Sequence, residues 1–239
     1  MKQPKKLIFV DYDGVMIPQS DGVYPSCGNT FEGLAETYHL DRNEYDLIAK
    51  TYPEVYDRFV AAYEQFGKTA VEQIKRICRE TGAMAVVSSN WKRFGDTFHR
   101  DLFRARGMEE CYFGVNTCYQ TDDISFGRER VLANPAYPFG KDNINSDVYD
   151  ECKVPQRVAE IWQFAFDHPS VCAICAIDDI YLAPYMEGHF VETYGCRINE
   201  KGELDTTDDH RLGLNPSEAD EIIAHLSDPG NYLFGRSDR

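Results

Sequence analysis

Three short runs of apolar residues recur along the chain, and each ends abruptly in polar residues. The runs cover 7–10, 83–87 and 171–177. Continuous apolar segments of this length are typical of strands that are buried on both faces of a sheet. The pattern therefore predicts three interior strands.

Helical periodicity precedes the second and third strands and returns near the end of the chain. Apolar residues fall on one face over 69–82, where Gly82 suits a helix terminus, and again over 154–168. The last helix has a clear start, because Asn215 can cap it and Glu218 completes a capping box.

Strands that alternate with amphipathic helices predict an α/β fold, a Rossmann-like parallel sheet flanked by helices. We expect a core domain over 1–14 and 67–239, with a small helical, cap-like insertion over 15–66 after the first strand. Residues 109–150 are rich in tyrosine, asparagine and aspartate and are predicted to be loop-like.

All three predicted strands end in side chains that can bind a ligand. These endings are Asp11 and Asp13 after the first strand, Ser88, Ser89 and Asn90 after the second, and Asp178 and Asp179 after the third. Ligands of parallel sheets bind beyond the carboxyl ends of the strands, so we expect the endings to share one crevice.

The charge of the chain argues against one class of partner. The 239 residues carry a formal net charge of −15, which disfavours capture of nucleic acid by bulk electrostatics. A local basic cluster remains, either a solvated helix face or, less favoured, a polyanion-binding patch; it comprises Lys92, Arg93, Arg100, Arg104 and Arg106.

The cysteines and the N-terminus indicate a cytoplasmic protein without a membrane segment. Eight cysteines occur at irregular spacing, mostly inside apolar runs, as reduced core residues do. Cys172 and Cys175 have a CxxC spacing, but such positions on a strand face opposite sides, which disfavours a shared metal. The apolar run near the N-terminus is too short for a signal peptide.

Four carboxylates in one crevice would repel one another unless a cation offsets them. An all-oxygen site of this kind suits Mg²⁺. A phosphoryl group is the natural electrophile for such a site, because it brings its own oxygens to the ion. Asp-x-Asp-Gly alone can also be an ordinary turn after a strand.

Four segments in order resemble the motifs of the haloacid dehalogenase-like (HAD) phosphohydrolases. They are "LIFVDYDGV", "AVVSS", "KVPQRVAEIW" and "CAIDD". The signatures "SSNW", "RVAEIW" and "DDHRLGLNPSEADEIIAHL" are similar, more narrowly, to the HAD domains of Swiss-army-knife RNA-repair proteins. This resemblance covers the first strand, 66–100 and 150–226, and leaves out the insertion after the first motif.

The resemblance implies a Mg²⁺-dependent phosphatase that forms an aspartyl-phosphate. Asp11 would be the nucleophile and Asp13 the general acid and base. Mg²⁺ would be held by Asp11, by the backbone carbonyl of Asp13 and by one or both of Asp178 and Asp179.

The remaining implied residues bind the phosphoryl group. Ser88 would hydrogen-bond its oxygens, with Ser89 and Asn90 as close substitutes, and Gly14 would let the backbone approach. Lys153 or Arg157 would offset its charge: the family usually has lysine, whereas Arg157 matches the narrower signature.

The expected substrate is a small phosphorylated metabolite or a nucleotide. The alternatives are a polynucleotide-end phosphatase of RNA or DNA repair and a catalytically silent phosphate-binding module. A phosphorelay receiver is disfavoured, because there the paired acids come early and the phosphorylated aspartate later. His99 and His168 fit no triad and are expected at the surface, and Trp91 is expected to pack beneath the site.

Overall fold

The computed structural model describes the chain in several stretches, and all structural statements below refer to these. They are residues 5–17, 50, 63, 66–117, 123–134, 153–186, 188–193 and 213–233, with the side chains of 153–155 left out. Most of the predicted 15–66 insertion therefore lies outside the described residues.

The described strands form one parallel sheet of five members in the order β3-β2-β1-β4-β5. They are β1 (Lys5–Val10), β2 (Ala83–Val87), β3 (Tyr112–Val115), β4 (Val171–Asp178) and β5 (Phe190–Glu192). The predicted α/β class with a Rossmann-like parallel sheet is confirmed, and β1 occupies its centre.

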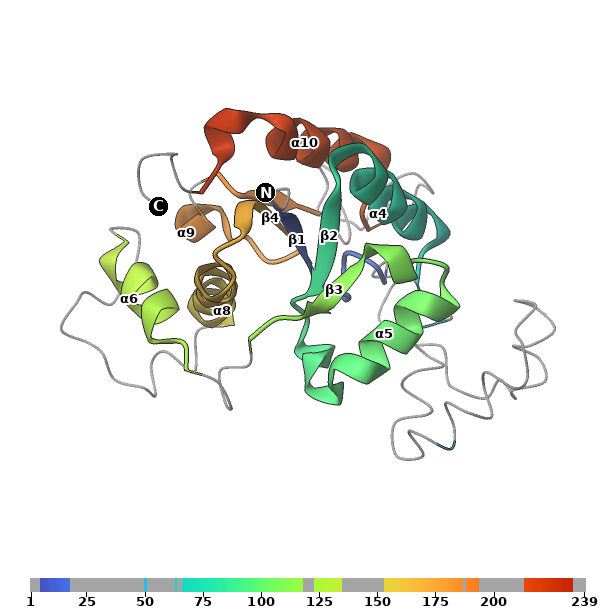
Figure 1. Cartoon of the computed structure of the whole chain (residues 1–239), viewed down its shortest axis with the longest axis horizontal. Helices are drawn as coiled ribbons and strands as arrows, with labels where there is room; N and C mark the ends of the chain where they lie inside the picture. The colour runs from blue at the N-terminus through green and yellow to red at the C-terminus, as the bar shows by residue number, and fades with distance from the viewer. Residues whose placement is uncertain are drawn as a thin grey trace, which may run out of the picture.

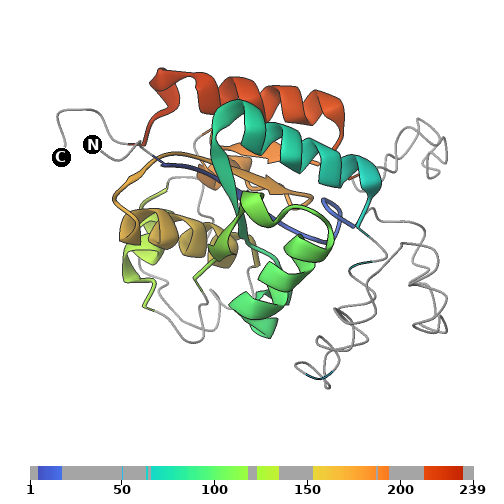
Figure 2. The ribbon, with the colours of Figure 1, turned by 45° about the vertical axis from the view of Figure 1, so that its right-hand side comes forward.

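Helices cover both faces of this sheet (Figures 1 and 2). On one face lie α4 (Lys68–Thr81), α5 (Asp96–Ala105) and α10 (Pro216–Ser227), and on the other α6 (Ser125–Ala133) and α8 (Lys153–Asp167). Shorter helices are η1 (Asn90–Phe94), η2 (Glu109–Cys111), α9 (Ala183–Met186) and η4 (Pro229–Asn231).

The alternation of side chains along β1 explains why its apolar run is continuous. Ile8 and Val10 pack into the core under α4, α5 and α10, whereas Leu7 and Phe9 pack into the core under α8. All four are at most 1% exposed, as expected for a strand covered on both faces.

Two predicted helix boundaries are present as expected. Gly82 ends α4 in the left-handed conformation with φ of 70°. Asn215 caps α10 by accepting hydrogen bonds from the backbone of Ser217 and Glu218, and the Glu218 side chain accepts one from the Asn215 backbone.

Two local predictions were wrong. The segment 109–150 contains β3 and α6 and is not loop throughout. Cys172 and Cys175 pack into the same core cluster, because the pairing of β1 with β4 is irregular beside Lys5 and shifts the alternation at Cys172. Neither cysteine forms a disulfide bond.

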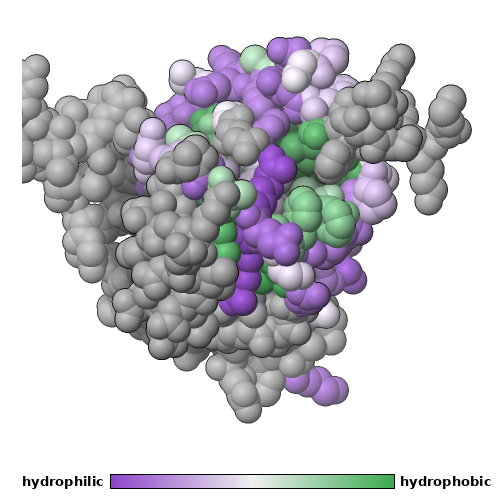
Figure 3. Space-filling view, turned by 90° about the vertical axis from the view of Figure 1, so that its left-hand side faces the viewer, coloured by the Kyte–Doolittle hydropathy of each residue, from purple (hydrophilic) through white to green (hydrophobic). Residues whose placement is uncertain are grey.

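The surface has few large exposed apolar side chains among the described residues, namely Phe166 and Tyr181. Figure 3 shows a band of hydrophilic residues beside smaller hydrophobic areas on the side where α6 and α9 lie. No helix in the described part of the chain is both long and apolar enough to cross a membrane.

Gly127 allows α6 to pack closely on α8. A Cβ atom at this position would lie 1.8 Å from the Ala159 carbonyl oxygen. We expect Gly127→Ala to lower the free energy of unfolding by about 2–3 kcal/mol, because the helices must separate. Urea unfolding checks this.

The matched control is Gly82→Ala, where no atom lies within 4 Å of the added Cβ and only the positive φ is unfavourable. We expect a loss of about 1 kcal/mol there. Equal losses in the two variants would contradict the close-packing argument.

Candidate active site

Five polar side chains follow one another along the carboxyl edge of the sheet. Backbone hydrogen bonds continue past the strands, joining Asp11 N to Ile177 O at 3.1 Å and Ser88 N to Val10 O at 2.9 Å. Similar bonds place the outer members, so the row reads Asn116, Ser88, Asp11, Asp178 and Thr193 from β3 to β5.

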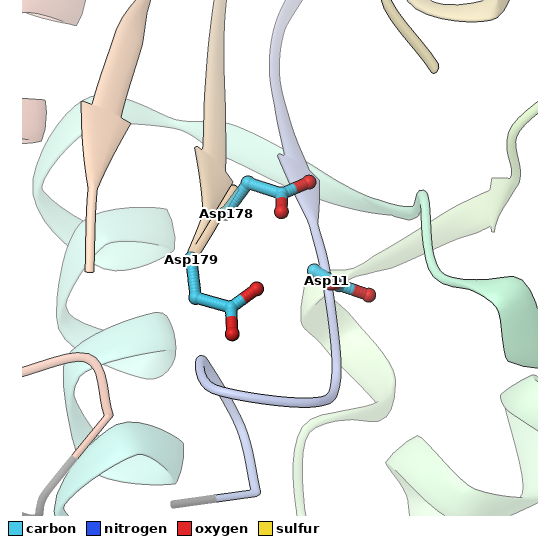
Figure 4. Close-up of side chains that lie close together, drawn as sticks. All are labelled: Asp11, Asp178 and Asp179. Carbon is cyan, nitrogen blue, oxygen red and sulfur yellow. The ribbon is translucent and has the colours of Figure 1, made fainter. Parts of the chain in front are cut away.

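Three carboxylates gather at the centre of this edge. Each of Asp11, Asp178 and Asp179 offers a carboxylate oxygen, and these oxygens lie within 4.8 Å of one another. Figure 4 shows Asp178 and Asp179 projecting from the end of β4 beside the chain that follows β1, where Asp11 lies. The structure thus brings the acidic endings of the first and third predicted strands together.

Arg157 of α8 bridges two of these carboxylates. Its Nη1 donates to Asp11 Oδ2 at 2.8 Å and to Asp178 Oδ2 at 2.5 Å, and the residue is 7% exposed. Lys153 is the first residue of α8, but its side chain lies outside the described part of the chain. Of the two predicted cations, the structure therefore describes only Arg157 at the carboxylates.

One guanidinium does not offset the negative charge of this cluster. Burial raises the pKa of Asp178 to about 7, although Arg157 opposes the shift. Burial and then the Asp11 charge raise the pKa of Asp179 to about 6. The ionised site therefore lacks positive charge, and three hard oxygen donors suit Mg²⁺.

Gly14 belongs to a tight turn that closes over Asp179. Its φ is 76°, and a Cβ atom there would lie 2.3 Å from Asp179 Oδ2. Its carbonyl oxygen accepts a hydrogen bond from Thr193 Oγ1 at 3.1 Å. The glycine thus lets the chain after β1 approach the end of β4, a structural reason for the residue that the sequence alone did not provide.

Comparison with known proteins decides the family. The sequence model of the HAD domain in Swiss Army Knife RNA repair proteins matches residues 7–197. The chain belongs to this family. Searches of curated proteins and of solved structures found no match.

The match differs in extent from the resemblance seen in the sequence. It spans the 15–66 segment, which the resemblance left out, and it ends before the signature at 208–226. As a member of this family, the chain has a phosphatase-type hydrolase domain. HAD proteins generally use Mg²⁺, and the name of this family connects it with RNA repair.

The three polar residues that follow β2 of this HAD domain are not equivalent. Ser88 is 2% exposed and its Oγ accepts a hydrogen bond from Asn116 Nδ2 at 3.1 Å. Ser89 instead caps η1, accepting from the Trp91 backbone at 3.4 Å, and Asn90 is an exposed residue at the start of η1. Ser88 alone of the three stands in the polar row beside Asp11.

Sequence reasoning missed two polar residues of the site. Asn116 is 4% exposed and its Oδ1 has no hydrogen-bond partner in the described structure. Thr193 is 1% exposed and bonds Gly14. Asn116 follows β3 and Thr193 follows β5, two strands that the apolar runs did not reveal, so no signal pointed to either residue.

His99 was expected at the surface, and this was wrong. It is fully buried on α5, where its Nδ1 lies 2.8 Å from Tyr12 Oη and its Nε2 3.0 Å from the Trp91 carbonyl oxygen. His168 is partly exposed and stacks on Phe164. Trp91 packs against the core as predicted, but it also donates from Nε1 to Asp13 Oδ2 at 3.1 Å.

Every member of the basic cluster contacts another group, and, within the described part of the chain, three of the five form ion pairs. Lys92 forms a buried ion pair with Glu160 of α8 and donates to the Thr117 carbonyl oxygen at 3.1 Å. The other members have an acidic, aromatic or carbonyl partner: Arg93 with Phe94, Arg100 with Asp96, Arg104 with Asp101, and Arg106 with the carbonyl of Phe66. These contacts favour the interpretation as a helix face over a polyanion-binding patch.

Asp179→Asn should stabilise the metal-free protein. A carboxyl group whose pKa is raised from 3.8 to about 6 in the folded protein lowers stability as the pH rises from about 3.8 to 6, and the full loss is present above pH 6. At pH 7.5 with EDTA we expect the variant to be about 1–2 kcal/mol more stable than the wild type in urea unfolding, allowing for partial exposure. Asp220→Asn, an exposed residue paired with Arg76, is the control and should change little.

With saturating MgCl₂ the order should reverse, because the wild type gains more from a ligand that binds only the folded state. A wild type that remains the less stable protein in Mg²⁺ would contradict Asp179 as part of the cation site.

His99 should make stability depend on pH. Burial lowers its pKa from 6.5 to about 4, so the unfolded chain binds the proton first and stability falls as the pH drops from 6.5 toward 4. The shift corresponds to about 3 kcal/mol. We expect the advantage of wild type over His99→Gln in urea unfolding to shrink by about 2–3 kcal/mol between pH 7 and pH 4. Between pH 7 and 8 the difference should be constant, and a constant difference down to pH 4 would refute the argument.

Proposed function

We propose that this HAD domain is a Mg²⁺-dependent phosphomonoester hydrolase that acts through an aspartyl-phosphate on Asp11. The observation that carries the proposal is the cluster of Asp11, Asp178 and Asp179 with Arg157 bridging two of them. A carboxylate can attack a phosphoryl group only if the negative charge of that group is offset. Arg157 provides a fixed cation beside Asp11 for this purpose.

Each side chain then has a defined part in the reaction. Asp11 attacks phosphorus while Asp13 protonates the leaving oxygen, and Asp13 next removes a proton from the water that hydrolyses the aspartyl-phosphate. Arg157 rather than Lys153 balances the charge of the transferred group, since it touches Asp11 directly. Ser88 donates its hydroxyl to a phosphoryl oxygen, which it is free to do because its oxygen already accepts from Asn116.

The cation site consists of Asp11, the Asp13 carbonyl, Asp178 and Asp179. When bound, Mg²⁺ would supply positive charge that offsets these carboxylates and the phosphoryl oxygens. Gly14 supports this assignment, because its turn lets the chain that follows Asp13 approach Asp179 closely.

The preferred substrate is a small phosphorylated metabolite or a nucleotide. The net charge of −15 and the ion pairs made by basic residues of the 92–106 stretch support this choice over a long polyanion. The family's connection with RNA repair supports a nucleic-acid end as the second candidate. The 15–66 segment would act as a cap over the site, and its two ends leave the core together, since Gly67 N donates to the Met16 carbonyl oxygen at 2.8 Å.

Asp11→Asn tests the proposal. With p-nitrophenyl phosphate and Mg²⁺ we expect wild-type turnover that EDTA abolishes, and a loss of at least about 1000-fold in kcat for the variant, because an amide cannot attack phosphorus. Asp220→Asn should retain full activity.

Turnover that is unchanged in Asp11→Asn, or no Mg²⁺-dependent turnover in the wild type, would overturn the proposal; the second result would favour a silent phosphate-binding module. A panel of phosphorylated metabolites, nucleotides and 3′- and 5′-phosphorylated oligonucleotides, compared by kcat/KM, then separates the two substrate classes.

A further inference from the structure

The side chain of Asp13 is held by an indole that the proposed chemistry does not itself use. Trp91 Nε1 donates to Asp13 Oδ2 at 3.1 Å. An indole N–H can only donate, so it marks Oδ2 as the accepting oxygen of that carboxyl group. A proton carried by Asp13 is then placed on the other oxygen, Oδ1.

Trp91 itself is fixed from three sides. Its backbone N–H donates to Ser89 Oγ, its carbonyl oxygen lies 3.0 Å from His99 Nε2, and its ring meets Phe94 edge-on with centroids 5.8 Å apart. Each contact comes from a different part of the residue. The ring also packs against Tyr12, with centroids 6.0 Å apart, so its two aromatic neighbours restrict rotation of the indole away from Asp13.

Behind Trp91, the contacts return to the chain beside Asp13. Tyr12 Oη lies 2.8 Å from His99 Nδ1, and both side chains are fully buried. A neutral imidazole with its proton on Nε2 satisfies both neighbours, because it donates to the Trp91 carbonyl and accepts from the Tyr12 hydroxyl. Since Tyr12 precedes Asp13 in the sequence, the hydrogen bonds and the chain form a closed ring.

We propose that Trp91, supported by His99 and Tyr12, is a positioning residue that holds the Asp13 carboxyl group in the orientation needed to protonate the leaving oxygen. This inference rests on the proposed function, in which Asp13 is the general acid. It predicts that loss of the indole N–H lowers kcat/KM most for substrates whose leaving group must be protonated, because a good leaving group departs without a proton.

The test compares Trp91→Phe with Trp162→Phe. The two tryptophans are the only ones in the chain, and Trp162 donates from its indole to the Tyr185 carbonyl oxygen at 3.3 Å, so the control loses the same kind of bond. The substrates are phenyl phosphate, with a poor leaving group, and 2,4-dinitrophenyl phosphate, with a good one. The parameter is kcat/KM, which includes the phosphoryl-transfer step.

For Trp91→Phe we expect kcat/KM to fall about 10- to 100-fold with phenyl phosphate and by no more than about 2-fold with 2,4-dinitrophenyl phosphate. Trp162→Phe should change both substrates by the same factor. Should Trp91→Phe fail to fold, His99→Gln serves instead, because it changes the residue that contacts the Trp91 carbonyl oxygen. It should lower kcat/KM for phenyl phosphate more than for 2,4-dinitrophenyl phosphate, by a smaller factor than Trp91→Phe.

Equal losses on both substrates in Trp91→Phe, or no loss on either, would overturn the inference while leaving the phosphatase intact. If the wild type hydrolyses neither ester in Mg²⁺, the proposed function fails and the inference fails with it. The two failures are therefore distinguished by the wild-type measurement alone.

Discussion

The bridge from Arg157 to Asp11 and Asp178 is the interaction on which this site depends. It joins the first and fourth strands through a helix on one face of the sheet, and all three residues are less than 9% exposed. Buried carboxylates side by side are unfavourable without a cation, and removal of one partner from such a pair leaves an uncompensated charge. The position of α8 against the sheet is therefore tied to the charge balance of the site.

The same constraint explains why the site costs stability. A single guanidinium leaves the pKa values of Asp178 and Asp179 raised, so the folded chain holds carboxylates that ionise only with difficulty. An arrangement that favours a divalent cation is unfavourable without one. Sites of this kind are retained for binding and chemistry and not for the stability of the fold.

The sequence predicted those features that depend on local pattern. The strand β1, the end of α4 at Gly82 and the Asn215 cap follow from composition, backbone preference and hydrogen bonding within a few residues. The convergence of Asp11 with Asp178 follows from the rule that parallel strands end at the same edge. By contrast, β5 is only three residues long, and β3 has four with a glycine among them, so neither has a detectable pattern.

Side-chain partners could not be predicted for a different reason. Lys153 and Arg157 are four residues apart in one helix and so share a face, and periodicity cannot say which one reaches Asp11. His99 was missed because its partners Tyr12 and Trp91 are distant along the chain or belong to another element, and only the packing of α5 brings them together.

The hydrogen bond between Gly67 and Met16 has a consequence for how this domain can vary. The core itself fixes the two points where the chain departs and returns. For a flexible connection between two such points, the entropic penalty of closure grows only with the logarithm of its length. Segments of quite different size could therefore replace one another there while the sheet and its carboxyl edge fold as before. Descendants of one ancestral domain could acquire new specificities in this way without redesigning their interior.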